Sequence, residues 1–241
     1  MNRTIKKWLL WSGILASVVR IAADVLAAAW YPGYSFWDQT MSQLAAVGAP
    51  TQGFHIVFLA IFCVLMTAFG AGIWLSAKKE LSLKMAGLFI ALHGVFGLIS
   101  LPFPQTAMQL GGGMAAQSVH LIVCSVLLVL IFLFIGFGAV AHGTHFRLYS
   151  AATVAIMLLF GFLTATKAPH AVDYAAPGMG ILERISYYSY LLWIAVFSIL
   201  HLRKRPLEDR EAGQTLGNED ASAGLRKATP DGRARTSRAS R

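Results

Sequence analysis

Four ionisable side chains interrupt long apolar stretches of the sequence, and they are the first candidates for chemistry. Arg20 and Asp24 lie one helical turn apart, so a helix would present both on one face. Glu183 and Arg184 stand together at the start of another apolar stretch. A charged side chain inside a membrane-spanning segment is costly and marks a functional site by default. If these stretches cross a membrane, a site is expected around these four residues.

The four residues suit different roles. Arg20 and Asp24 can offset each other's charge, which gives either a self-contained structural ion pair or a pair that binds a charged group between helices. Arg184 is the stronger candidate for a ligand, because its planar guanidinium suits phosphate or carboxylate. Glu183 is interpreted first as a carboxylate stabilised by a helix N-terminus, with a catalytic role as the alternative.

Residues for hydrolysis are also present. His120 lies near the start of the fourth apolar stretch and would be the general base, with Ser42 or a water as the nucleophile. Glu183 or Asp24 would orient the histidine, and Arg184 would stabilise developing negative charge. These residue types suffice for the chemistry, but sequence alone does not bring them together.

No metal or cofactor is expected. The sequence has no P-loop, no Rossmann glycine fingerprint and no HExxH motif. Its two cysteines, Cys63 and Cys124, form no CxxC pair and are interpreted as packed within apolar stretches. His55 and His93 are likewise interpreted as core residues. The candidate ligand-binding set is therefore Arg20, Asp24, His120 and Arg184.

The elements that carry these residues are predicted to be membrane helices. The chain is 56% hydrophobic and only 13% charged, whereas an ordinary soluble domain is about 25% charged. A bilayer span takes roughly 20 mostly apolar residues, and continuous apolar runs select helices over barrel strands. The predicted spans are residues 8–30, 54–76, 84–101, 117–140, 147–166 and 182–202. This pattern predicts an all-α, polytopic membrane protein with a six-helix transmembrane domain over residues 1–202.

Basic residues predict the orientation of the helices. Lysines and arginines gather before the first span, between spans two and three, between spans four and five, and after span six. The alternate loops, about 31–53, 102–116 and 167–181, hold the single basic residue Lys167. Because basic loops stay in the cytoplasm, both termini are expected there, in a bacterial cell (inner) membrane. The candidate residues would then face the outside.

The last segment differs from the rest. Ten of the twenty lysines and arginines fall within residues 203–241, which contain no aromatic residue. This composition predicts a disordered basic cytoplasmic tail. Beside a membrane, its charge favours anchoring and attraction to anionic lipid over nucleic-acid binding. No nucleic-acid partner is expected, while membrane lipid is.

Short motifs placed consistently relative to the spans point to a family. The chain resembles the domain of unknown function 998 family of multi-pass bacterial and archaeal membrane proteins over residues 10–202. The family usually shows an aspartate soon after a Phe-Pro pair, where this chain has Gln105 and Thr106. The matching residues are Tyr34, Met41-Ser42-Gln43-Leu44, Gly48, Phe103-Pro104, His120, Gly180, Glu183-Arg184 and Trp193.

The resemblance implies a six-helix bundle with recurrent polar residues on the outer side, and it implies no reaction. It joins Ser42, His120 and Arg184 into one candidate constellation. We expect the protein to bind or move a lipid or amphipathic small molecule through an outer-facing polar site. A structural or regulatory membrane subunit and a hydrolase-like enzyme at the outer face remain the alternatives.

The predicted topology can be tested with reporter fusions. Fusions after residues near 45, 108 and 175 should report an outside location, and fusions near 80 and 144 an inside location, because the basic loops are held in the cytoplasm. Paired reporters, each active on one side only, provide the control. A cytoplasmic signal at any of the first three positions would contradict the six-span arrangement.

Overall fold

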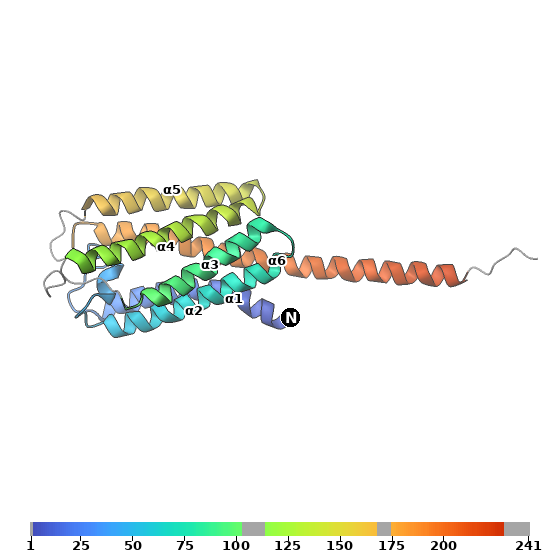
Figure 1. Cartoon of the computed structure of the whole chain (residues 1–241), viewed down its shortest axis with the longest axis horizontal. Helices are drawn as coiled ribbons and strands as arrows, with labels where there is room; N and C mark the ends of the chain where they lie inside the picture. Colours follow the sequence, from blue (N-terminus) through green and yellow to red (C-terminus); the bar gives the residue numbers. More distant parts are fainter. Residues whose placement is uncertain (1, 103–113, 168–174, 229–241) are drawn as a thin grey trace, which may run out of the picture. The chain divides into compact units, whose positions relative to one another are not determined.

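The computed structural model describes the backbone of residues 2–102, 114–167 and 175–228. Within these ranges the chain forms six long α-helices and one short 3-10 helix, with no β-strand. In chain order they are α1 (Arg3–Trp30), η1 (Met41–Ala45), α2 (Gln52–Ser76), α3 (Leu81–Ser100), α4 (Met114–Val140), α5 (Thr144–Lys167) and α6 (Met179–Ala228), as drawn in Figure 1.

All six α-helices contain a segment long and apolar enough to cross a membrane. Backbone N–H and C=O groups have no partner in lipid, so a spanning segment must bond within itself, as a helix does. The prediction of an all-α, multi-pass protein with six spans is confirmed. The helix boundaries differ modestly from those predicted: α6 begins at Met179 and not near residue 182, and α2 begins at Gln52.

Helix α6 stays helical beyond its apolar segment, as far as Ala228. Residues Met1–His201 form one compact unit, and Leu202–Arg241 form a second. The first unit contains the described spans and the polar residues discussed below. The disorder expected for residues 203–241 stays a prediction.

Small residues allow α2 and α3 to approach closely. A Cβ added to Gly70 would lie 2.3 Å from the backbone nitrogen of Ala91 and 2.5 Å from the Gly87 carbonyl oxygen. Further along the same contact, a Cβ on Gly94 would lie 2.5 Å from the Cys63 carbonyl oxygen. Close backbone approach of this kind is how membrane helices gain van der Waals contact without a hydrophobic driving force.

Side-chain hydrogen bonds attach α6 to its neighbours. The Ser17 hydroxyl of α1 donates to the Leu191 carbonyl at 2.8 Å. On the other side, the Trp193 indole donates to the Ser150 hydroxyl of α5 at 2.8 Å. Trp193 itself is fully buried and packs among aromatic side chains. Helix α6 therefore lies between α1 and α5, which fixes the position of the polar residues near its start.

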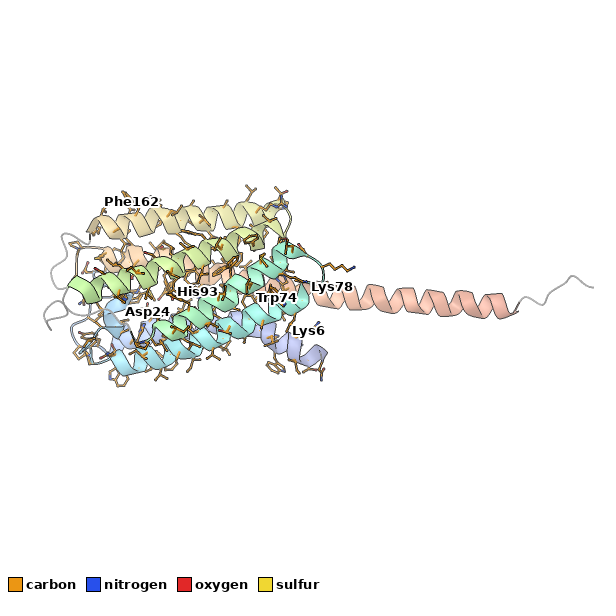
Figure 2. The ribbon with its side chains drawn as sticks, viewed as in Figure 1. Lys6, Asp24, Trp74, Lys78, His93 and Phe162 are labelled. Atoms are coloured by element: carbon orange, nitrogen blue, oxygen red, sulfur yellow. The ribbon has the colours of Figure 1, made fainter. Side chains whose placement is uncertain are left out.

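The two ends of the bundle differ in chemistry. Figure 2 places Asp24 toward the end where η1 lies, Lys6 and Lys78 toward the other end, and His93 between them. We term the first the η1 end; it comprises residues 20–55 and 175–188. Large apolar side chains such as that of Phe162, which is 66% exposed, point outward, as expected for a surface in contact with lipid.

The α2–α3 contact yields a direct test of the packing. Gly70→Ala should lower the melting temperature in detergent, because overpacking against backbone atoms costs about 1–3 kcal/mol. Gly136→Ala is the matched control, since its added Cβ would meet nothing within 4 Å and alanine favours the helix. Equal melting temperatures for the two variants would contradict the close contact.

Candidate functional site

The loop between α1 and α2 folds against the start of α6. We term residues 31–51 the cap. The backbone N–H of Gly178 donates to Asp38 Oδ1 at 2.9 Å, and the Ser35 hydroxyl donates to Asp38 Oδ2 at 2.8 Å. These two bonds hold the pKa of the Asp38 carboxyl below its usual value. Asp38 is therefore a charged anchor between the cap and α6 at neutral pH.

Glycine is required where the cap meets α6. Gly178 has a φ of 73°, a left-handed conformation that favours glycine. A Cβ on Gly180 would lie 2.2 Å from the Gln39 carbonyl oxygen. In the same contact, the Ile181 N–H donates to the Trp37 carbonyl at 2.9 Å. The cap backbone therefore lies directly on the first turn of α6.

Asp24 and Arg184 form a two-point ion pair inside the bundle. Arg184 Nε lies 2.9 Å from Asp24 Oδ2, and Arg184 Nη2 lies 3.1 Å from Asp24 Oδ1. The Asp24 side chain is 0% exposed and the Arg184 side chain is 1% exposed. The Tyr188 hydroxyl also donates to Asp24 Oδ2. The aspartate expected to pair with Arg20 along α1 is thus bound by α6 instead, because α6 supplies a bidentate partner.

Arg184 also binds the cap. Its Nη1 contacts the carbonyl oxygens of Phe36 at 2.7 Å, Gln39 at 3.0 Å and Gly180 at 3.2 Å. Its Nη2 donates to the Tyr34 hydroxyl at 2.7 Å. Together with Asp24, these acceptors engage all five N–H groups of the guanidinium. Arg184 therefore joins α1, α6 and the cap, and it has no donor left for a ligand.

Glu183 has a different position from the one expected. The sequence predicts a first-turn carboxylate, but α6 begins four residues earlier, at Met179. Its Oε2 accepts the backbone N–H of Met41, which starts η1. The carboxylate therefore caps the 3-10 helix of the cap and not its own helix. Glu183 becomes a second connection between α6 and the cap.

Arg20 is also buried, at 5% exposure, and its hydrogen-bond partners are neutral. Asp24 lies within electrostatic range of Arg20 without forming an ion pair with it. Its Nε donates to the Tyr187 hydroxyl at 3.1 Å, and its Nη1 lies 3.0 Å from His55 Nε2. No carboxylate oxygen lies within 4 Å of Arg20 among the residues that the structure describes. Three of its five N–H groups have no acceptor in the described part of the chain.

The contact with Arg20 fixes the proton on His55. A guanidinium can only donate, so His55 Nε2 accepts and Nδ1 carries the hydrogen of the neutral ring. His55 is 1% exposed, and its Nδ1 has no hydrogen-bond partner within the described ranges. A buried donor without an acceptor costs about 1–3 kcal/mol. Arg20 and His55 thus form a small region of unused donors.

The remaining candidates, His120 and Ser42, lie on α4 and η1. His120 Nε2 lies 3.5 Å from Cys124 Sγ on the same helix, and half-buried Ser42 lies on η1. Cys124 in turn interacts electrostatically with Glu183, so this part of α4 lies within range of the start of α6.

Sequence reasoning missed Tyr187, Tyr188 and the role of His55. Tyr187 and Tyr188 follow Arg184 by three and four residues, which places all three on one helix face; this spacing was the available signal. His55 was interpreted as a packed core residue. It is buried, but it also contacts Arg20.

A double-mutant cycle tests the Asp24–Arg184 pair. Asp24→Leu and Arg184→Met should each cost about 3–5 kcal/mol, because each leaves an uncompensated buried charge. The double variant should lose clearly less than the sum, since both charges are gone. Stability would be measured by denaturant titration in detergent. Strictly additive losses would show that the two side chains do not act as a pair.

Residues 14–200 match the family described as Protein of unknown function (DUF998). No curated protein and no solved structure matches. The match covers all six apolar segments in whole or large part. The chain therefore belongs to the DUF998 family, a membrane domain to which no function is assigned.

Proposed function

We propose that this protein binds, or moves across the membrane, a lipid or amphipathic small molecule whose anionic group is held by Arg20. The observation that carries the proposal is that Arg20 is a buried cation whose described partners, Tyr187 and His55, are both neutral. We also propose that the η1 end faces the outside of the cell membrane, as the basic loops at the other end suggest.

The two buried arginines differ in how completely they are paired. A buried charge is tolerated when it is paired and fully hydrogen-bonded. Arg184 meets this condition through Asp24 and the cap. Arg20 does not meet it with the described residues, so an anion bound there would gain both Coulomb energy and unused donors. Arg184 accordingly leaves the ligand-binding set that the sequence suggested.

A structural or regulatory subunit is the second candidate, and one observation favours it. The Asp24–Arg184 pair, with Tyr188 and the cap, is complete without a ligand. If Arg20 only fastened helices in the same way, the whole η1 end would serve the fold. A hydrolase at this end stays a third candidate, with His120, Ser42 and Glu183 as its residues.

Native mass spectrometry in mild detergent tests the proposal. The parent should carry a discrete lipid or metabolite that Arg20→Gln loses, because the variant removes the cation while keeping hydrogen-bonding capacity. Lys7→Gln is the matched control: it removes one positive charge from an exposed position on α1, far from the η1 end, and should retain the molecule.

Thermal melting of the three proteins would establish that they fold alike. Identical bound molecules in parent, Arg20→Gln and Lys7→Gln would contradict binding at Arg20 and would favour the structural role. Loss of the molecule in Arg20→Gln alone would support the proposal, and its mass would define the class of ligand.

A further inference from the structure

The unused donors of Arg20 lie at one end of its guanidinium. The Nε–H bonds to Tyr187 and one Nη1–H bonds to His55, so the remaining three N–H groups are on the adjacent nitrogens Nη1 and Nη2. Paired N–H groups of this kind match the two oxygens of a carboxylate. We propose that the anionic group held at Arg20 is the terminal carboxylate of a single-chain amphipathic acid. This inference rests on the proposed function.

The local charge favours an anion with one negative charge. His55 accepts from Arg20 and is therefore neutral, and Tyr187 is an uncharged donor or acceptor. Arg20 thus supplies one positive charge, and Asp24 and Glu183 already act on it electrostatically. Arg184 cannot share a ligand because Asp24 and the cap engage all of its donors. A phosphate monoester carries about −1.5 to −2 and three acceptor oxygens, which exceeds what one arginine balances.

Because the site is buried, it favours a ligand whose charged group is at the end of its chain. Arg20 is 5% exposed and His55 is 1% exposed. The Thr51 hydroxyl of the cap donates to the Leu44 carbonyl at 2.8 Å, which ties η1 down beside the start of α2. The phosphate of a phospholipid carries one charge but is attached on both sides, so it needs a wide opening. A terminal carboxylate can reach a buried guanidinium end-on.

The depth of the site fits a molecule that lies in the bilayer. Arg20 is ten residues before the end of α1 at Trp30, about 15 Å along the helix axis. His55, which meets its guanidinium, is in the first turn of α2. The charge is therefore held within the apolar segments, about half of the thickness of the hydrocarbon core from the end of α1, so that an acyl chain attached to a bound carboxylate would lie among apolar residues.

A comparison of four ligands with equal chains tests the inference. Dodecanoate, dodecyl phosphate, dodecyl glycerophosphate and dodecan-1-ol would be added to delipidated protein at neutral pH, and binding would be followed by the rise in melting temperature and by native mass spectrometry. Dodecanoate should bind best, and its apparent affinity should fall about tenfold or more in Arg20→Gln. Lys7→Gln should bind like the parent.

The outcomes separate the inference from the proposed function. Tighter binding of either phosphate ligand, lost in Arg20→Gln, would overturn the carboxylate assignment while leaving an anion site at Arg20. Equal binding of the alcohol, or dodecanoate binding unchanged in Arg20→Gln, would overturn both. Arg20→Lys serves if Arg20→Gln does not fold: it keeps the charge without the planar fork, and it should weaken dodecanoate binding less than Arg20→Gln but measurably.

Discussion

The ion pair between Asp24 and Arg184 is the interaction on which the η1 end depends. It crosses from α1 to α6 with two hydrogen bonds, and its side chains are 0% and 1% exposed. In such a position a charge must have a complete set of partners. The cap provides the missing acceptors through the Phe36 and Gln39 carbonyls and the Tyr34 hydroxyl. A loop that would otherwise cross the helix ends freely is therefore held in a fixed position.

The Asp24–Arg184 pair affects which partners are bonded to the neighbouring Arg20. Asp24 lies one turn from Arg20 on α1 and would be its natural partner. Both Asp24 carboxylate oxygens bond Arg184, while the hydrogen bonds described for Arg20 go to the neutral side chains of Tyr187 and His55. The two arginines at this end of the bundle therefore differ. Arg184 uses all of its N–H groups within the fold, and Arg20 has N–H groups without a described acceptor. This difference supports a binding role for Arg20 and a structural role for Arg184.

Much of the fold could be predicted, because apolar length alone determines which segments span a membrane. The six helices and the family follow from the sequence, as does the clustering of charged residues near one end. The partners could not be predicted. Asp24 could pair with Arg20, one turn away on α1, or with Arg184 on α6. The position of α6 beside α1 determines that it pairs with Arg184. The acceptors for Arg184 are mostly backbone carbonyls, which carry no sequence signal.

The most direct test of this account compares the stability of two matched variants, Arg184→Met and Arg20→Met, after lipid removal. Arg184→Met should melt at a much lower temperature than the parent, because it leaves Asp24 buried without its cation and frees the cap. Arg20→Met should lose far less, because it removes a buried charge that has no carboxylate partner among the described residues. Equal losses of melting temperature in the two variants would contradict the division of roles between the two arginines.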